Sequence, residues 1–214
     1  MSMQIYKHIY MVQIICYKYA GMSENDKKRE IRQKALSLFR QKGYDNVTVN
    51  EIAKAAGISK NTFYYYYDSK EDLIRDVFRP SAYNGEKLAV ELMKIADPWE
   101  QILKFCSMSA QHFEGLGKEV VRKAMIMNLA SSFVEGDRSR PHPNEWTREM
   151  ISAIYQRAIE QNRIRTDLSV KEIMKLQMTL LIGCLQCWAT MSSDIELEQT
   201  YLRMVQEVLR PDGH

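Results

Sequence analysis

The sequence predicts an all-α protein, and three observations point to that fold class. Past residue 26, apolar residues recur at the three- and four-residue spacing of amphipathic helices. No segment shows a sustained alternation of apolar and polar residues, which is the pattern of a half-buried β-strand. Five prolines and nine glycines are too few for a β protein rich in loops. The 214 residues are enough to bury a sizeable core in one or two domains.

The first helix is predicted over residues 27–42, and a second follows a capping box. The apolar stripe of the first helix is made by Ile31, Ala35, Leu38 and Phe39. Gly43 ends this helix, because glycine adopts the left-handed conformation of a helix C-cap at little cost. Thr48 and Glu51 have the spacing of a capping box, so the second helix begins there and runs to about Ala56.

Two short helices are predicted next. The chain turns at 57–58, and Ser59 caps a third helix that reaches about Tyr66. A second start signal of the same kind, the segment 69–72, opens a fourth helix. That helix is interrupted or kinked at Pro80, since proline cannot continue the backbone hydrogen bonding of a helix.

The rest of the chain predicts six more helices with softer boundaries. The stretch 136–143 is the most loop-like segment, because it combines glycine with two prolines. Start signals are supplied by Asp97 with Pro98, by Asn144, by Ser169 with Glu172, and by Asp194. The predicted ranges are about 81–96, 98–115, 118–134, 144–162, 169–191 and 194–209.

Residues 1–26 are predicted to be an N-terminal extension that is not part of the fold. Residues 1–21 are apolar and rich in tyrosine, but basic residues interrupt a run that is too short to cross a membrane. No long apolar core with a small-residue cleavage site is present, so a signal peptide is not predicted. Met22 opens a polar stretch typical of a protein start, which favours an upstream extension from a misassigned start codon. The alternative is a short extra helix or strand that packs on a partner.

The basic residues gather in one block of the sequence. Residues 27–79 hold 12 Lys and Arg against 7 Asp and Glu, a net charge of +5. Residues 80–214 hold 16 Lys and Arg against 18 Asp and Glu, a net charge of −2. A small basic block on a near-neutral body is typical of a module that binds phosphate groups, and chance clustering is the alternative at this point.

The segment 48–66 has the pattern of a helix-turn-helix. A helix, a short turn and a second short helix follow one another, and small residues near the turn let the helices cross closely. In that motif the N-terminal residues of the second helix meet base edges in the major groove of DNA. With the capping Ser59, the candidate contacts there are Lys60, Asn61 and Thr62. The sequence therefore predicts DNA binding through this helix.

Five consecutive aromatic residues end the same helix. Successive helical residues point about 100° apart, so one core face cannot take all five. Phe63 and Tyr67 are four residues apart and are assigned to the core. Tyr64 and Tyr65 then face DNA, where phenol hydroxyls bind phosphate, and Tyr66 is open to either role. The competing interpretation is that all five aromatics only pack in the core.

These residues resemble the DNA-binding domain of the TetR family of regulators. The matching residues are Ala35-Leu-Ser-Leu-Phe39, Gly43-Tyr44, Thr48-Val49, Glu51-Ile-Ala53, Ala56-Gly-Ile-Ser-Lys60, Thr62-Phe-Tyr64, Tyr66 and Ser69-Lys-Glu-Asp-Leu73. The resemblance implies an all-helical homodimer on a palindromic double-stranded DNA operator. By position, the DNA contacts it implies are Thr48, Lys60, Thr62, Tyr64, Tyr65 and Lys70. Asn61 and Tyr65 depart from the glycine and histidine that the family often has, so base preference is expected to differ.

The sequence thus predicts a helix-turn-helix DNA-binding domain over 27–79 and a larger helical ligand-binding and dimerisation domain over 80–214. The resemblance implies that the helices at about 170–191 and 195–209 pair with their copies; a large monomeric core is the alternative. It also implies a cavity for an unidentified small-molecule effector. The candidates for its lining are apolar or amphipathic side chains with a polar handle: Phe105, Met108, His112, Met125, Trp146, Tyr155 and Gln177.

Nothing in the sequence predicts an enzyme, a cofactor or a metal site. No Gly-rich phosphate loop, nucleophile elbow or paired-carboxylate motif is present, and the four histidines lack metal-ligand spacing. Cys184 and Cys187 form a CxxC pattern, but without a second ligand pair they are expected to be buried small side chains rather than a metal or redox site. Scattered cysteines suit a reducing cytosol. The expected function is a cytoplasmic repressor released by its ligand; an activator and a non-specific architectural DNA-binding protein are the alternatives.

Overall fold

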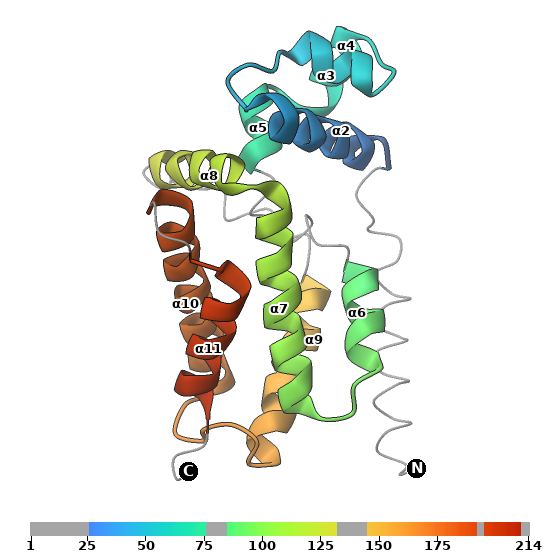
Figure 1. Cartoon of the computed structure of the whole chain (residues 1–214). Coiled ribbons are helices and arrows are strands. Elements are labelled where there is room, and N and C mark those ends of the chain that lie inside the picture. The colour runs from blue at the N-terminus through green and yellow to red at the C-terminus, as the bar shows by residue number, and fades with distance from the viewer. Residues whose placement is uncertain (1–25, 76–84, 132–144, 192–194, 211–214) are drawn as a thin grey trace. The chain divides into compact units, whose positions relative to one another are not determined.

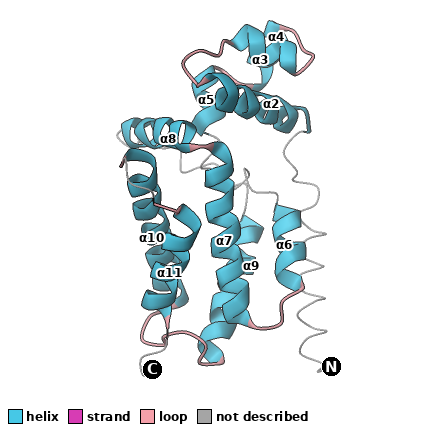
Figure 2. Ribbon diagram, in the orientation of Figure 1, coloured by secondary structure: helices cyan, strands magenta, loops and turns pink. Residues whose placement is uncertain are grey.

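The computed structural model describes residues 26–75, 85–131, 145–191 and 195–210, and every regular element in them is an α-helix (Figures 1 and 2). In chain order these are α2 (Asp26–Lys42), α3 (Val49–Ala55), α4 (Lys60–Tyr66), α5 (Lys70–Arg75), α6 (Gly85–Met93), α7 (Pro98–Leu116), α8 (Lys118–Ser131), α9 (Glu145–Glu160), α10 (Val170–Thr190) and α11 (Leu197–Leu209). The predicted all-α fold is confirmed. The predicted N-terminal extension lies outside the described residues, except for Asp26 at the start of α2.

The described residues divide into two compact units. The head unit contains residues 26–75 and 113–131, which are α2 to α5, the last turn of α7, and α8. The body unit contains residues 85–112, 145–191 and 195–210, which are α6, most of α7, α9, α10 and α11. α8 therefore belongs to the head unit, although two helices separate it from α5 in the sequence.

Hydrogen bonds at helix N-termini confirm most of the predicted start signals. The hydroxyl of Ser59 accepts a backbone N–H of the first turn of α4 at 3.0 Å. Thr48 and Glu51 make both hydrogen bonds of a capping box at α3, and Ser169 and Glu172 do the same at α10. These side chains satisfy backbone donors that a helix start leaves without partners, so each boundary is encoded locally.

Of the start signals predicted for α7, α9 and α11, only that of α7 is confirmed. Asp97 Oδ1 accepts two backbone N–H groups of the first turn of α7, at 2.8 and 3.1 Å, as predicted. Asn144 and Asp194 lie outside the described residues. α11 begins at Leu197, later than predicted, and its N-cap Glu196 makes no side-chain cap hydrogen bond. Burial of its apolar face, rather than a cap, accounts for this helix.

The core of the head unit forms where α3 meets α2 and α4. Its buried apolar side chains include Ile31, Ala35, Phe39, Ile52, Ala53, Phe63, Tyr67 and Leu73. The rings of Phe39 and Tyr44 meet edge-on with their centroids 5.0 Å apart. The hydroxyl of Tyr67 donates to the backbone carbonyl of Lys28 at 3.2 Å, which satisfies the one polar atom of a buried ring.

The first turns of α8 hold the loop that follows α2. The Glu119 carboxylate accepts the backbone N–H of Tyr44 at 2.9 Å. Lys123 Nζ lies 3.1 Å from Asp45 Oδ1 and 5.1 Å from the centroid of the Tyr44 ring. Arg40, near the end of α2, donates to a backbone carbonyl at the end of α7 at 2.7 Å. α8 is therefore a structural part of the head unit.

In the body unit α10 packs against both α11 and α9. The buried side chains of α10 are Ile173, Gln177, Leu181, Cys184, Leu185, Trp188 and Ala189. Those of α11 are Leu197, Tyr201, Val205 and Leu209. The stripe on α11 repeats every four residues, as expected for a helix buried along one side. Within the described ranges, no helix combines the length and the apolarity that crossing a membrane requires.

Gly43→Ala should destabilise the head unit by about 1–2 kcal/mol. Gly43 has φ +78°, where an L side chain is strained, and a Cβ there would lie 3.3 Å from the Glu119 carboxylate that holds the loop. Urea denaturation followed by circular dichroism measures the change. Gly115→Ala is the matched control, because a Cβ there meets open space, and it should leave stability unchanged or slightly higher. Equal losses in the two variants would contradict this account of Gly43.

Candidate nucleic-acid interface

A tight turn joins α3 to α4 and determines how the two helices cross. The backbone N–H of Ile58 donates to the Ala53 carbonyl at 3.0 Å, and Gly57 adopts φ +63°. A positive φ is inexpensive only for glycine, so this residue allows the sharp turn. Ser59 then starts α4, and its hydroxyl oxygen lies 2.8 Å from that of Thr62. The predicted arrangement of helix, turn and helix is therefore present.

One side of α4 is anchored in the core and the other is open. Phe63 is fully buried, and Tyr67 at the C-cap is almost fully buried. Tyr65 is 82% exposed and Tyr64 is 44% exposed, as expected for side chains that face DNA. Tyr66 is half-buried, and its ring meets that of Tyr65 edge-on with centroids 5.0 Å apart. The alternative in which all five aromatics only pack in the core is therefore wrong.

Polar residues in the first turn of α4 lie beside these tyrosines. Lys60 and Asn61 are exposed, whereas Thr62 is half-buried. Lys60 Nζ lies 6.0 Å from the centroid of the Tyr64 ring, at the outer limit of a cation–π contact. An ammonium, an amide and two phenols thus share one exposed surface. We call it the reading surface, and its residues are Lys60, Asn61, Tyr64 and Tyr65. These groups bind phosphate oxygens and base edges in protein–DNA complexes.

Thr48 and Lys70, two other predicted DNA contacts, also make contacts within the head unit. Thr48 caps α3 through Glu51, and the Lys42 ammonium with these Thr48 hydrogen bonds holds the pKa of Glu51 at about 2. The Lys70 ammonium donates to two carbonyls of the loop after α2, at 2.9 Å each, and lies 4.1 Å from the Tyr44 ring centroid. Both residues therefore support the fold, and their phosphate contacts stay predictions.

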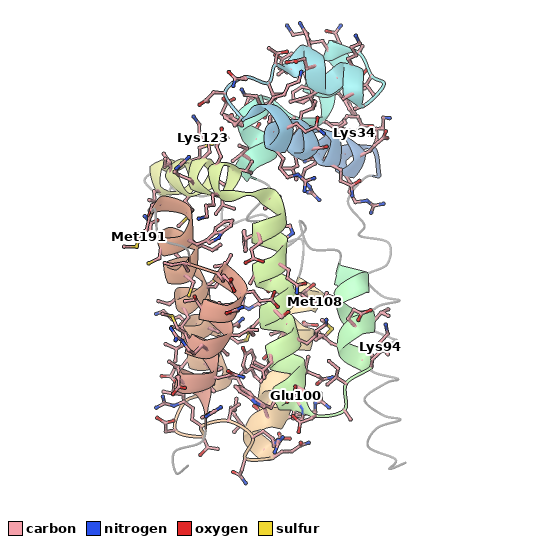
Figure 3. All side chains as sticks on the ribbon, viewed as in Figure 1. Lys34, Lys94, Glu100, Met108, Lys123 and Met191 are labelled. Atoms are coloured by element: carbon pink, nitrogen blue, oxygen red, sulfur yellow. The ribbon has the colours of Figure 1, made fainter. Side chains whose placement is uncertain are left out.

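The predicted effector residues divide between the two units. Those in the body unit are Phe105, Met108, His112, Tyr155 and Gln177. Tyr155 and Gln177 are buried, whereas the three on α7, among them Met108 in Figure 3, are half-buried. Met125 lies on α8 in the head unit. Trp146 lies in α9, and its side chain is outside the described residues.

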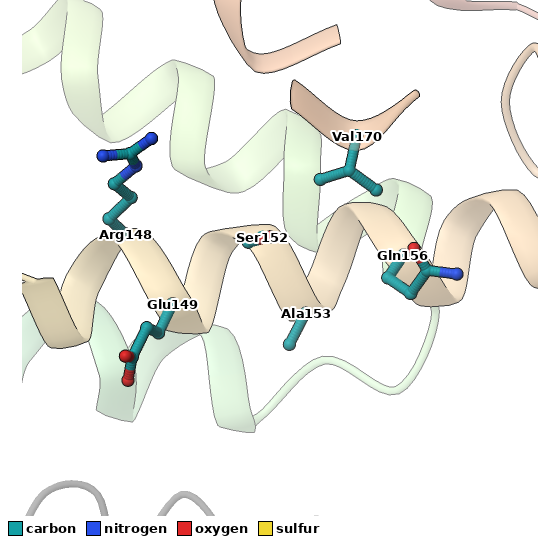
Figure 4. Close-up of a pocket in the computed structure, with 6 residues that line it drawn as sticks. All are labelled: Arg148, Glu149, Ser152, Ala153, Gln156 and Val170. Atoms are coloured by element: carbon teal, nitrogen blue, oxygen red, sulfur yellow. The ribbon is translucent and has the colours of Figure 1, made fainter. Parts of the chain in front are cut away.

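A shallow depression of about 540 Å³ opens on the exposed side of α9 (Figure 4). It is lined by Arg148, Glu149, Ser152, Ala153, Gln156 and Val170. None of the predicted effector residues is among them. Most of these side chains are exposed, so the depression lacks the apolar enclosure that small-molecule sites usually have.

Sequence patterns do not reveal the residues that support the loop beside α3. Glu119 and Lys123 contact this loop from positions that are distant in the sequence, and Arg40, close to the loop in the sequence, bonds to the distant Gly115 carbonyl. The one local signal is the place of Glu119 in the first turn of a predicted helix. Acidic side chains are common there because the helix dipole favours negative charge, so this signal does not point to a contact with the loop. Their role could be recognised only from the folded arrangement.

The head unit is similar to known bacterial regulators. Residues 31–77 match the family model described as bacterial regulatory proteins, tetR family. The negative transcriptional regulator IcaR of the biofilm operon icaADBC from Staphylococcus epidermidis is 44% identical over 48 residues, 22% of this chain and 26% of that protein. The HTH-type transcriptional regulator YuxN of Bacillus subtilis is 51% identical over 49 residues, 23% of this chain and 17% of that protein. The chain thus spans about a quarter or less of the curated relatives it matches.

Solved structures are similar over most of the chain. A TetR transcription regulator from Haloarcula marismortui has a TM-score of 0.59 at 24% identity, covering 87% of this chain and 100% of that one. FadR from Thermus thermophilus, in complex with lauroyl-CoA, has a TM-score of 0.54 at 23% identity, covering 84% and 93%. RolR in complex with resorcinol has a TM-score of 0.55 at 20% identity, covering 86% and 87%. These likenesses establish the fold.

Tyr64→Phe should weaken DNA binding about three- to tenfold, because it removes one exposed hydroxyl from the reading surface. The measurement is a titration of fluorescent duplex DNA selected by the protein from random sequences. The matched control is Tyr67→Phe, whose lost hydroxyl bonds to Lys28 within the core. That control should lower the melting temperature but bind DNA normally below it. An unchanged affinity for Tyr64→Phe would show that this ring does not face DNA.

Proposed function

We propose, from the match of residues 31–77 to the model of the tetR family of bacterial regulatory proteins, that this chain is a DNA-binding transcriptional regulator of that family. The observation that carries the proposal is the reading surface on α4. Its polar side chains are exposed on a short helix that Phe63 and Tyr67 anchor in the core. The net charge of +5 over residues 27–79 supports it, because neutralising DNA phosphates provides much of the affinity of such proteins.

We further propose that the protein is a repressor released by a small-molecule effector. IcaR is named as a negative regulator, and two of the structurally similar proteins hold a ligand, lauroyl-CoA or resorcinol. The effector would favour a conformation that holds two reading surfaces at the wrong separation. Half-sites on one face of DNA lie roughly 34–36 Å apart, so a small change in separation prevents simultaneous docking.

Two copies of the chain are proposed to pair through α10 and α11, which would match a palindromic operator. Large apolar side chains remain exposed on these helices: Met178, Ile182, Met191 and Met204 (Met191 is labelled in Figure 3). Exposed apolar residues that cluster on helices of one unit are typical of a protein–protein interface. A symmetric pair would present the reading surface twice, as a symmetric operator requires.

Within this function, we propose that residues 27–79 bind DNA and that residues 80–214 bind the effector and form the dimer. α8 lies within residues 80–214 of the sequence, but in the structure it packs in the head unit with the proposed DNA-binding helices. The protein would act in the cytoplasm, where its operator is accessible. The reading surface and Thr48, Ser59, Thr62 and Lys70 are the proposed DNA contacts.

The experiment that tests the function is selection of duplex DNA from a random pool by the purified protein, followed by sequencing. We expect a palindrome with two half-sites about one helical turn apart. Enrichment without a shared sequence would instead indicate a non-specific architectural protein, and no enrichment would contradict DNA binding. A reporter driven from the selected operator then separates a repressor from an activator.

Lys60→Ala should lower operator affinity and flatten its dependence on salt. Each phosphate contact adds about 0.9 to the slope of log affinity against log salt, so a dimer losing two Lys60 contacts should lose about 1–2 units of slope. Binding titrations at salt concentrations from about 50 to about 300 mM, which span the physiological value, measure this slope. Lys94→Ala, directly after α6, is the control: Lys94 (labelled in Figure 3) is exposed in the body unit and pairs with Glu91. Parallel slopes for the two variants would exclude Lys60 as a phosphate contact.

Ile182→Lys should convert the dimer to a monomer, because it places a charge on the exposed apolar face of α10. The matched control is Val90→Lys on α6: Ile182 is 49% exposed and Val90 is 54% exposed, and both belong to the body unit. Size-exclusion chromatography with light scattering gives the mass. Operator affinity should fall at least about tenfold with the dimer, since each half-site is then bound alone. A monomeric wild-type protein, or a dimeric Ile182→Lys variant, would contradict this interface.

A further inference from the structure

Tyr155 on α9 is fully buried, and its hydroxyl has no hydrogen-bond partner among the described residues. Thr147 lies two turns earlier on α9, about 12 Å along the helix, and its buried hydroxyl also lacks a partner among the described residues. Most buried polar groups in folded proteins are hydrogen-bonded, because an unpaired one loses its hydration without compensation. The unpaired hydroxyl of Tyr155, the more deeply buried of the two residues, indicates a place where a bound molecule supplies the missing partner.

Three other helices surround Tyr155 with polar groups that are already engaged. Gln177 on α10 donates to the Tyr201 hydroxyl on α11 at 2.9 Å, and its amide nitrogen lies 3.5 Å from Cys106 Sγ on α7. Burial, and then the nearby Cys106, raise the pKa of Tyr155 well above its ordinary value. Burial likewise raises the pKa of Cys106 to about 12. The phenol and the thiol therefore both stay neutral at physiological pH.

Buried apolar residues lie within one turn of Cys106, Tyr155 and Gln177 on their own helices. They include Ile102, Ala110, Ile154, Ala158, Ile173 and Leu181. The charged residue of α9 nearest to Tyr155 in the sequence is Arg157; its guanidinium donates a hydrogen bond to Gln101, while its buried Nε has no partner among the described residues. A charged ligand beside Tyr155 would lose its hydration, and the guanidinium nearest to it on α9 is already bonded to Gln101, so these surroundings favour an uncharged ligand.

Side chains that can adapt to a guest molecule lie beside Cys106 on α7. Phe105, Met108 and His112 follow one another along α7 at helical spacing, and all three are half-buried. Methionine in particular changes its rotamers at little cost and fills irregular space. Cys106 follows Phe105 in the chain and successive helical residues point about 100° apart, so these side chains lie next to the face of α7 that carries Cys106.

We propose that Tyr155 is the hydrogen-bond donor to an uncharged effector that enters along α7 and is enclosed by α7, α9 and α10. The effector is an apolar molecule with one acceptor, such as a ketone, ester or ether oxygen. The Gln177–Tyr201 pair and Cys106 form the wall behind the donor. This assignment rests on the proposed function as a ligand-responsive regulator, and it names the chemistry of the ligand.

The first test compares Tyr155→Phe with Tyr201→Phe in the ligand-free protein by thermal denaturation. Removing an unpaired hydroxyl relieves a cost, so Tyr155→Phe should melt at the wild-type temperature or above it. The Tyr201 hydroxyl accepts from Gln177, so Tyr201→Phe should melt about 2–4 °C lower. A Tyr155→Phe variant that loses as much as Tyr201→Phe would mean that the Tyr155 hydroxyl has a structural partner, and would overturn the proposal.

The second test uses two probes of equal ring size, cyclohexanone and cyclohexanecarboxylate, in the same thermal assay over a concentration series. Cyclohexanone should raise the melting temperature of the wild-type protein, and the carboxylate should not. In Tyr155→Phe the apparent Kd for cyclohexanone should rise about tenfold. No shift with cyclohexanone, an equal shift with the carboxylate, or an unchanged Kd in Tyr155→Phe would each overturn the assignment.

Neither thermal assay uses DNA, so the proposed regulator function and the proposed Tyr155 site are tested independently. A protein that selects no operator but binds cyclohexanone through Tyr155 would contradict the proposed function and keep this site. A protein that selects an operator but ignores cyclohexanone would keep the function and lose the site.

Discussion

The burial of Phe63 and Tyr67 on one side of a two-turn helix is the constraint on which the reading surface depends. Two aromatic side chains removed from water contribute several kcal/mol, on the order of 2–3 each, which is a large share of the stability of a small unit. Four residues advance a helix by slightly more than one turn, so fixing both rings also fixes the rotation of α4 about its axis. Tyr64, Tyr65 and Lys60 are exposed as a consequence, not by separate interactions.

The position of this helix depends in turn on the loop after α2. The loop is held from two sides, because Glu119 accepts the Tyr44 N–H while Lys70 donates to the carbonyls of Tyr44 and Val47. A loop whose backbone groups are bonded to side chains of α5 and α8 cannot shift without those helices. Lys70 therefore has a structural role besides its proposed phosphate contact, and an ammonium with three N–H donors can serve both.

Local sequence signals predicted the elements well, and the contacts between elements could not be predicted. Ser59 and the Thr48–Glu51 box encode their helix starts within four residues, so the boundaries of α3 and α4 follow from short patterns. The division of the aromatic run followed from helical geometry alone. By contrast, the Glu119–Tyr44 hydrogen bond joins residues 75 positions apart, and no periodicity reports it. Amphipathicity shows that a face of α8 is buried, but not that it packs in the head unit.

The distribution of similarity has a physical explanation that bears on the effector. In the proteins described above, identity is 44–51% over 48–49 residues of the head and 20–24% over most of the chain. A unit that binds DNA must fit the fixed spacing of a DNA backbone, which restricts its sequence. A helical body needs only apolar residues at the right period, and many sequences satisfy that requirement. The relatives described therefore match part of the head, and they do not indicate the chemistry of the proposed effector. A buried hydroxyl without a partner, as at Tyr155, depends on this chain's own packing, so it carries information about the ligand that similarity does not.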